Sequence, residues 1–368
     1  MPEHFLLAGV RPPALTIAAI ALTPGGSGAL IFLIATIVVA VCFDFTNGFH
    51  DTANAIATSV STRALPARVA ILMATGLNFL GAFVSTQVAK TIGTDVAQRT
   101  SLTQVAVMAA LLAAIGWNLI TWYYGLPSSS SHALIGGLIG AAVVVSSHQL
   151  GRVTFEALKG GGILKVVLSL ILSPPLGLAL AYTLAIALIW IFRRTPPGRV
   201  SDISRWLQRL SAAFVAFSHG SNDAQKTMGV ITAAVLSYQG ASASAQFHVP
   251  VWVIILSATA MGLGTSFGGW RIIQTMGMRV VKLRPIDGFA AETAAGSIII
   301  AASSLGLPVS TTHVIAGSIM GVGARQRLGA VRWGVAGDMV VAWILTGPIS
   351  AIIAALFAII LLAVGLRG

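Results

Sequence analysis

The chain has 368 residues, of which 56% are hydrophobic and only 9% are charged, and its mean hydropathy is +0.89. Soluble domains carry about 25% charged residues. The composition therefore excludes an ordinary cytosolic enzyme, a disordered chain and a fibrous repeat, and it predicts an all-α polytopic membrane protein. A single cysteine, Cys42, excludes a disulfide framework, a multi-cysteine zinc site and an iron–sulfur cluster. No cofactor and no permanent metal site are expected.

The net charge of +12 could suggest a nucleic-acid partner, but the basic residues lie in short clusters between apolar runs. The clusters are Arg193, Arg194, Arg199, Arg205 and Arg209; Arg271, Arg279, Lys282 and Arg284; and Arg325, Arg327 and Arg332. Such clusters orient a membrane protein by the positive-inside rule. We therefore expect a multi-pass protein of the lipid bilayer, in the plasma membrane (the inner membrane of a bacterium), with no nucleic-acid partner. A homo-oligomer stays an open alternative.

The first 28 residues do not fit a signal peptide, because their apolar run, 14–22, is short and ends at Pro24-Gly25-Gly26. We interpret residues 1–28 as a tail or interfacial segment. Long apolar runs with short breaks follow: 29–43, 67–90, 104–124, 132–147, 163–192, 210–218, 227–238, 250–267, 288–305, 312–324 and 333–366. The predicted domains are a first membrane repeat (29–194), a cytoplasmic linker (195–206) and a second membrane repeat (207–368).

Polar residues interrupt two of these apolar regions, at 44–54 and at 218–226. Polar and charged groups are costly in lipid and persist where they line a cavity inside protein. The interruptions therefore predict broken helices at both places.

Two motifs occur twice in the same order. Phe45, Gly48 and Asp51 recur as Phe217, Gly220 and Asp223, at an offset of 172 residues. Leu126-Pro127 followed by four serines and His132 recurs as Leu307-Pro308 followed by Val309, three hydroxyl residues and His313, at an offset of 181. Two motifs repeated at nearly one separation indicate an internal duplication.

The charges of the loops predict that the two halves are inverted. The loop after the first interruption carries Arg63 and Arg68 and is expected inside, whereas its counterpart, 239–249, has no Lys or Arg and is expected outside. Arg152, Lys159 and Lys165 fall in a loop that this topology places outside, against the rule. Inverted repeats are the plan of many secondary transporters, with the substrate site at the repeat interface.

The repeated proline and hydroxyl motifs predict an anion site. Each proline ends a helix and the hydroxyl run begins the next one, which gives a pair of helix–loop–helix, re-entrant-like segments. Free N–H groups and hydroxyls at a helix N-terminus bind anions because the helix dipole is positive there. Two such starts suit a tetrahedral oxyanion; the candidate ligands are Ser129, Ser130, Ser131, Ser310, Thr311 and Thr312.

Asp51 and Asp223 occupy matching positions in the two interruptions, and a carboxylate at membrane depth indicates a functional site. Asn54 lies one turn after Asp51, and its amide oxygen with the carboxylate suits a hard cation. The matching residue in the second half is Lys226, whose ammonium would stand where that cation would bind.

Glu292 is the third acid of the predicted site. The first repeat has Leu111 at the equivalent position, so this acid is not part of the duplication. It is either a proton site or a partner for Lys226. The remaining candidates for the cavity lining are Asn47, His50, His219, Asn222, Gln225, His132 and His313, and for the last two simple packing is an equal alternative. Asp44 and Asp338 are expected near membrane ends, in structural roles.

The charges of this site constrain the mechanism. The three acids and Lys226 give the site a net charge of −2. A phosphate anion that entered this low-dielectric cavity would be strongly repelled. The anion can then enter only with protons, sodium or a divalent metal, which predicts coupled symport.

These segments resemble the inorganic phosphate transporter (Pit) family. The residues that carry the resemblance are Asn47-Gly48-Phe49-His50-Asp51-Thr52-Ala53-Asn54-Ala55, Phe217 to Lys226, Trp117-Asn118, Gly125 to His132, and Pro308 to Val314. The resemblance covers about 29–366. It implies a phosphate symporter with inverted repeats, in which the duplicated hydroxyl helix starts hold phosphate and the Asp/Asn pairs hold cations.

Sodium-coupled members of this family commonly have Asn in both signatures, whereas Gln225-Lys226 resembles the bacterial low-affinity, proton-coupled branch, which takes up metal–phosphate complexes. That branch often has a soluble insertion in its second half, and the short loop 239–249 leaves no room for one. The predicted function is secondary active phosphate import by proton symport, with a sodium-coupled symporter as the alternative.

Two other classes of protein compete with this prediction. An intramembrane serine hydrolase could use Ser130 or Ser131 with a histidine, but the motif is duplicated and no Gly-x-Ser-x-Gly elbow accompanies it. A passive anion channel would favour basic residues rather than mid-membrane acids in its lining. We therefore expect a carrier and not an enzyme.

Overall fold

The computed structural model describes residues 26–242 and 245–366, and the regular secondary structure of this part is helical, apart from an isolated β-bridge between Ala97 and Leu158. The helices are α1 (Ser27–Ser61), α2 (Ala67–Gly81), α3 (Gln87–Thr94), α4 (Gln104–Tyr124), α5 (Ser130–Leu150), α6 (Gly160–Phe192), α7 (Pro197–Tyr238), α8 (Val251–Phe267), α9 (Trp270–Gln274), α10 (Pro285–Ser304), α11 (Thr311–Gln326) and α12 (Trp333–Ala363). Short 3₁₀ helices lie at Arg99–Ser101 and Leu328–Ala330, and a π-helical segment lies at Thr275–Arg279.

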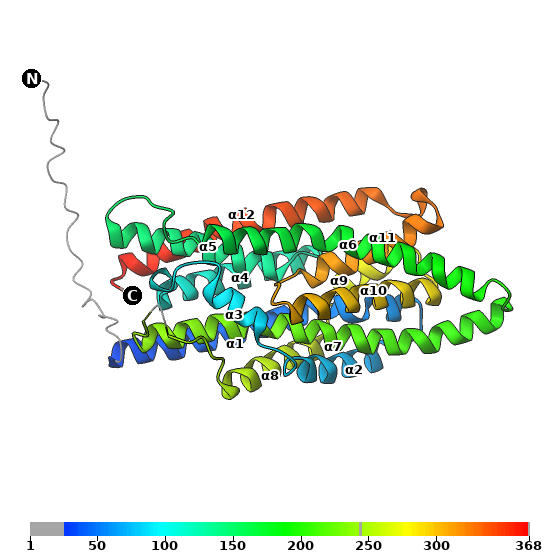
Figure 1. Cartoon of the computed structure of the whole chain (residues 1–368), viewed down its shortest axis with the longest axis horizontal. Coiled ribbons are helices and arrows are strands. Elements are labelled where there is room, and N and C mark those ends of the chain that lie inside the picture. Colours follow the sequence, from blue (N-terminus) through cyan, green and yellow to red (C-terminus); the bar gives the residue numbers. More distant parts are fainter. Residues whose placement is uncertain (1–25, 243–244, 367–368) are drawn as a thin grey trace, which may run out of the picture.

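Five helices of the described part are long and apolar enough to cross a membrane, namely α1, α4, α5, α6 and α12. The count is six if α8 and the following Trp270–Arg279, which bend by 65° at the break between them, are one span. Most helices lie along the long axis of the molecule, and α6 and α7 form a hairpin at one end (Figure 1). The all-α membrane class predicted from composition is thus confirmed.

The breaks expected at 44–54 and 218–226 are not present: both segments are helical, inside the 35-residue α1 and the 42-residue α7. The polar side chains there are buried against other helices, so they find partners while the helix satisfies its own backbone hydrogen bonds. The bend between α8 and α9 falls instead at Gly268, whose φ of +66° ends the helix.

Two connections between helices repeat each other closely. α4 ends at Gly125 (φ +65°), and α10 is followed by Gly306 (φ +67°), a left-handed conformation that favours glycine. Each glycine is followed by Leu-Pro and a short extended segment before α5 or α11 begins. The helix–loop–helix pairs expected from the duplicated motif are therefore α4–α5 and α10–α11.

The helices of the two halves pack across each other. α1 of the first half packs on α8 of the second, and the equivalent α7 packs on α2. In the same way α5 packs on α12, and the equivalent α11 packs on α6. Gly140 brings α5 against the backbone of α12, and Gly321 brings α11 against the backbone of α6, because a Cβ at either glycine would clash with a carbonyl group. The halves therefore interlock.

Of the expected linker 195–206, residues 197–206 form the first turns of α7. Most of the expected tail, residues 1–25, lies outside the described residues. Figure 1 also shows that α1 and α7 run in opposite directions along the long axis, as do α6 and α12.

Candidate functional site

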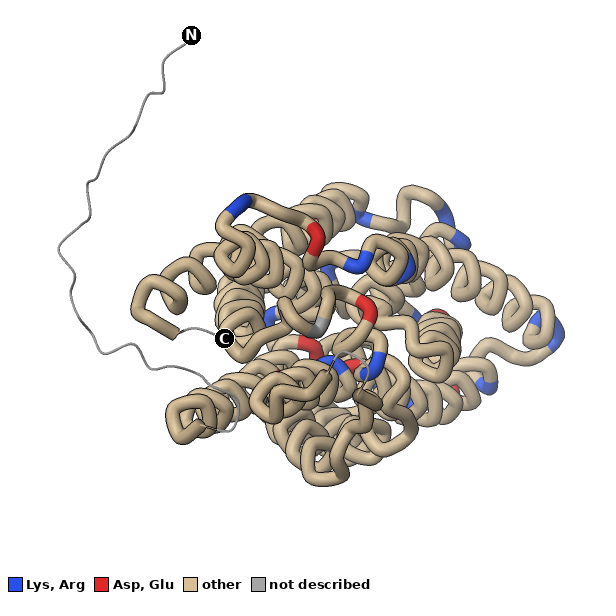
Figure 2. Tube along the Cα trace, turned by 60° about the vertical axis from the view of Figure 1, so that its left-hand side comes forward, with Lys and Arg blue, Asp and Glu red and all other residues tan. Residues whose placement is uncertain are grey.

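The centre of the candidate site consists of two buried carboxylates, Asp51 on α1 and Asp223 on α7, which are 2% and 0% exposed. Both lie well inside their long helices. In Figure 2 acidic and basic positions gather near the middle of the otherwise tan bundle, while most other basic positions lie at its periphery. Buried charges need partners, and the surrounding helices supply them.

Asp51 receives polar contacts from three helices. The Ser130 hydroxyl of α5 donates to Oδ2 over 3.2 Å, and the Thr312 hydroxyl of α11 donates to Oδ1 over 3.4 Å. The neighbouring His50 Nδ1 lies 2.6 Å from Oδ1, and its Nε2 lies 3.1 Å from the Thr121 hydroxyl of α4. Hydroxyls of both halves thus meet at one carboxylate.

Asp223 has a matching environment with one addition, an ion pair. Lys226 Nζ lies 2.8 Å from Oδ1, and Lys226 is 1% exposed. The Thr311 hydroxyl donates to Oδ2 over 3.4 Å, as Ser130 does to Asp51 in the first half. Asn47 Nδ2 and His219 Nε2 each lie 3.5 Å from the same oxygen. Lys226 is therefore paired inside the protein and does not reach bulk water.

The two hydroxyl runs lie at helix N-termini, as the sequence predicts, and they use the same cap. The Ser129 hydroxyl accepts from His132 N, and the Ser310 hydroxyl accepts from His313 N, both over 3.2 Å. The Ser131 hydroxyl donates to the Val309 carbonyl over 3.2 Å, which brings the two starts together. The cap serines are thus engaged by their own helices, while the next residues contact the carboxylates.

Several oxygens here could hold a cation. Asp51, His219 and Asp223 each offer one ligand atom, and these atoms lie within 4.8 Å of one another. The amide oxygens of Asn47 and Asn54 are buried and accept no hydrogen bond, while Asn54 Nδ2 donates to the Thr312 hydroxyl over 2.9 Å. Carboxylate and amide oxygens suit a hard cation.

Glu292 lies in a separate buried cluster and does not contact Lys226. Its carboxylate accepts from the hydroxyls of Thr58 and Ser211, each over 2.5 Å, and from Gln208 Nε2 over 3.2 Å. Of the two partners considered for Lys226, only Asp223 is found. Glu292 instead joins α10 to the last turn of α1 and to the first half of α7.

Two of the remaining candidates on α7 hold helices in place. Gln225 Oε1 accepts from the backbone N–H groups of Val88 and Ala89 and so caps the start of α3. Asn222 Nδ2 donates to the Ser303 hydroxyl over 3.0 Å, beside the α10–α11 connection. Neither side chain contacts the carboxylate pair.

His132 and His313 pack against each other with ring centroids 4.6 Å apart, and His313 stacks on Trp343 at 4.1 Å. Both histidines line a cavity of about 350 Å³ that also borders Pro174 and Gly347. The two rings thus pack as one alternative expects and also border a cavity, and their role stays a prediction.

The expected position of Asp44 is wrong. It was expected near a membrane end, but it lies in the middle of α1 and is 0% exposed. The signal that could have found it is the spacing, because Asp44, Asn47 and Asp51 lie three and four residues apart on one helix face.

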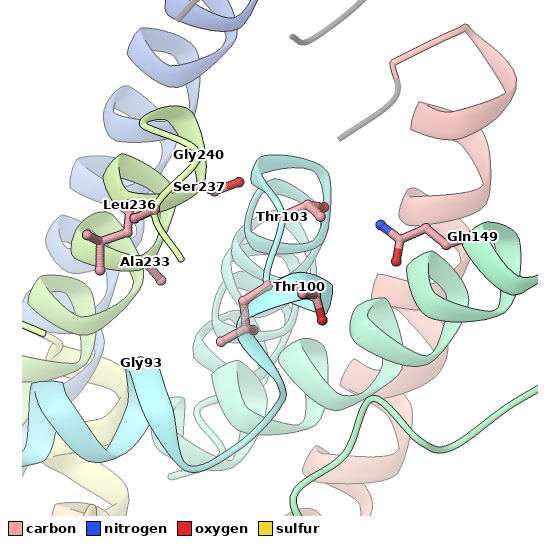
Figure 3. Close-up of a pocket in the computed structure, with 10 residues that line it drawn as sticks. Gly93, Thr100, Thr103, Gln149, Ala233, Leu236, Ser237 and Gly240 are labelled. Atoms are coloured by element: carbon pink, nitrogen blue, oxygen red, sulfur yellow. The ribbon is translucent and has the colours of Figure 1, made fainter. Parts of the chain in front are cut away.

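Another cavity, of about 230 Å³, lies near the end of α7 (Figure 3). Thr100, Thr103, Gln149 and Ser237 give it polar groups. The first residue of α7 that lines this cavity is Ala233. It follows Lys226 by seven residues, which is about 10 Å along a helix.

Comparison with known proteins matches the chain to one family. The model of the phosphate transporter family matches residues 47–354. Two relatives named "Probable low-affinity inorganic phosphate transporter" are each 47% identical. The one from Rhizobium meliloti (strain 1021) aligns over 325 residues, 88% of this chain and 95% of its own, and the one from Bacillus subtilis (strain 168) over 336 residues, 89% and 97%.

A solved structure, "The sodium-dependent phosphate transporter", is 25% identical and superimposes with a TM-score of 0.79, covering 90% of this chain and 99% of that one. Asp51, Asp223 and the hydroxyl groups beside them lie within the matched region, and the agreement extends over nearly the full length of each relative. The chain therefore belongs to the phosphate transporter family.

Proposed function

We propose that this protein imports inorganic phosphate across the plasma membrane by proton symport, either as the free anion or as a metal–phosphate complex. Its membership of the phosphate transporter family and the names of its relatives support phosphate as the substrate. The observation that carries the proton coupling is the buried pair of Lys226 and Asp223, which stands where the first half has Asn54 and Asp51.

The proposed architecture is a pair of inverted repeats. The opposite directions of α1 and α7 and the exchange of packing partners between the halves support it. The connections α4–α5 and α10–α11 would be the tips of re-entrant hairpins. In support, Ser130 at the start of α5 contacts Asp51, which lies well within α1 and far from its ends.

The proposed phosphate ligands are the hydroxyls and N–H groups at the starts of α5 and α11. Ser130, Ser131, Thr311 and Thr312 lie at or beside the carboxylates, and the cap residues Ser129 and Ser310 hold the two starts. Hydroxyls that now donate to Asp51 and Asp223 can donate to phosphate oxygens instead. The helix dipoles favour the anion at this place.

Coupling follows from the charge of the site. Asp51 and Asp223 carry two negative charges against one on Lys226, so an anion entering next to them is repelled unless positive charge enters as well. Protonation of a carboxylate supplies that charge. Lys226 pairs with Asp223 in this structure, which removes the need for a sodium ion at that position.

Sodium coupling is the second candidate. The unpaired amide oxygens of Asn47 and Asn54 near Asp51 favour it, as does the similarity to a sodium-dependent phosphate transporter. Under this alternative a sodium ion would bind at the Asp51 side only, because the ammonium of Lys226 excludes one beside Asp223.

Uptake of radiolabelled phosphate into proteoliposomes, driven by an imposed pH gradient or an imposed sodium gradient, separates the two candidates. We expect accumulation with the pH gradient in sodium-free buffer. Asp51→Asn and Asp223→Asn should each abolish accumulation while the purified protein stays folded. Strict sodium dependence, or normal accumulation in both variants, would contradict proton symport through these carboxylates.

A further inference from the structure

Asp44 is a buried acid that the proposed mechanism does not yet use. It is 0% exposed, it forms no ion pair among the described residues, and only the neutral side chains of Thr227 and Asn47 lie close enough to bond its carboxylate weakly. Leaving an ionised carboxylate without partners in a protein interior costs several kcal/mol. An acid kept in this position therefore calls for a bound proton or a nearby cation.

The charged groups that face Asp44 belong to α7. They are the Asp223 carboxylate and the Lys226 ammonium, and the polar neighbours are Thr227 and Asn47. Two further helices that pack on α1, α4 and α8, carry no charged residue. Asp44 is thus a second carboxylate within electrostatic reach of the one buried lysine.

The charges near the other end of α1 lie far from Asp44. Glu292 of α10 contacts Thr58, fourteen residues further along α1, or about 21 Å of helix. Arg68 of α2 follows the end of α1 by a short turn, and Arg271 of α9 lies against Trp122 and Tyr123 at the end of α4. None of these groups is a partner for Asp44.

Asp44 and Lys226 are also the two buried charged residues of these helices that have no charged counterpart in the duplication of α1 and α7. In the register that aligns Asp51 with Asp223, the second half has Ala216 in place of Asp44, and the first half has Asn54 in place of Lys226. One half has an added negative charge and the other an added positive charge. α1 packs on α7, and Asn47, one turn from Asp44, lies 3.5 Å from the Asp223 carboxylate that pairs with Lys226, so the two charges are within electrostatic reach of each other. The positive charge added in one half thus balances the negative charge added in the other.

We propose that Asp44 is a proton-binding carboxyl of the transport cycle, and that Asp44 and Lys226 together replace a mobile cation. This rests on the proposed proton symport. A lysine neutralises Asp223 but is never released, so it cannot couple transport to a gradient. Asp44 supplies the missing mobile charge: it binds a proton while Lys226 pairs with Asp223, and it releases the proton when the ammonium turns to it.

The variant Asp44→Asn tests this, because it keeps the size of the side chain and removes the titrating group. Asp202→Asn, an exposed position on α7, is the matched control. Three quantities are measured in proteoliposomes: phosphate accumulation driven by a pH gradient, phosphate–phosphate exchange at equal pH, and proton co-uptake reported by a trapped pH-sensitive dye.

We expect Asp44→Asn to lower the accumulation ratio about tenfold for each unit of pH gradient, because one coupled proton contributes a factor of ten per unit. Exchange should stay within about twofold of the unmodified protein, since phosphate binding does not require Asp44, and fewer protons should enter per phosphate. If Asp44→Asn folds poorly, Asp44→Ala introduces the residue that the other half has, and the same result is expected.

Unchanged accumulation with an unchanged proton-to-phosphate ratio would overturn the role of Asp44. So would loss of exchange together with accumulation in a folded variant, since that outcome assigns Asp44 to phosphate binding or structure. Failure of the proposed function looks different, because then the unmodified protein itself shows no accumulation with a pH gradient.

Discussion

At the scale of single residues, Lys226 has the largest effect on the charge of the site. Its ammonium is buried and paired with Asp223 at 2.8 Å, where the first half of the molecule has the neutral Asn54. A buried ion pair adds little net stability compared with apolar residues of the same shape, but removal of one partner leaves an uncompensated charge. Replacing Lys226 should therefore lower stability as well as change transport and ion dependence.

We predict that Lys226→Asn weakens proton-driven uptake and introduces dependence on sodium, because it restores in the second half the Asp and Asn pair of the first. Lys226→Met should lose uptake at least about tenfold, since Asp223 is then buried without its partner and the approach of phosphate is opposed. Uptake assays in proteoliposomes with and without sodium measure both effects. Full proton-driven uptake in Lys226→Met would contradict the role of the ammonium.

Glu292 is the second residue for which the structure makes a definite prediction. Glu292→Gln should change the free energy of unfolding by less than about 1 kcal/mol, because an amide can still bond the hydroxyls of Thr58 and Ser211. Glu292→Leu, which introduces the residue of the matching position 111, should lower that free energy by about 1–3 kcal/mol or more, since several buried donors lose their acceptor. Unfolding in detergent measures the difference, and equal stabilities would contradict a stabilising role of this cluster.

At the scale of helices, contacts between backbones decide how the two halves interlock. Gly140 allows α5 to lie directly on the Ala351 carbonyl of α12, and Gly321 allows α11 to lie on the Leu178 carbonyl of α6. These contacts set the positions of α5 and α11, and therefore the positions of the hydroxyls at their starts. A substitution far from the carboxylates can thus disturb the site.

We predict that Gly140→Ala lowers the free energy of unfolding by about 1–3 kcal/mol, because the added methyl group forces α5 away from α12. Gly116→Ala in α4 is the matched control, since a Cβ there meets nothing within 4 Å. The control should be neutral or stabilising by up to about 1 kcal/mol, as expected for glycine replaced by alanine within a helix. Equal melting temperatures for the two variants would show that the close contact has no such effect.

At the scale of the whole molecule, the proposed inverted arrangement predicts which side of the membrane each loop faces. The turn after α1 carries basic residues and the loop after α7 between 239 and 249 carries none. By the positive-inside rule the first lies inside and the second outside. The corresponding helices α1 and α7 would then cross in opposite directions, in agreement with their directions in Figure 1.

Labelling with a membrane-impermeant maleimide on intact cells tests this arrangement. The protein has one native cysteine, the exposed Cys42, which Cys42→Ser removes. In that background Gln246→Cys should label from outside, and Pro66→Cys should label only after the cells are permeabilised; both positions are exposed. Labelling of both from the same side would contradict inverted repeats.

The sequence alone determined the membrane class, the duplication and the helix starts at the hydroxyl runs. These follow from composition, from motifs repeated along the chain, and from the positions of Pro127 and Pro308, all of which are local properties. The family also followed from local motifs, and the comparison with known proteins confirms it. The roles of Ser130, Thr311 and the coupling residues stay predictions that the experiments above test.

Only the tertiary structure decided which polar residues meet. α1 and α7 stay continuous through their polar segments because neighbouring helices supply partners that no local pattern reveals. Glu292 bonds Thr58, 234 residues away, rather than Lys226, and Gln225 caps α3, 137 residues away. Asp44 lies within electrostatic reach of Lys226 because α1 packs on α7. The partner of a buried charge depends on helix packing, which is set by the whole fold, whereas the period of a helix and the start of a helix are set by the residues beside it.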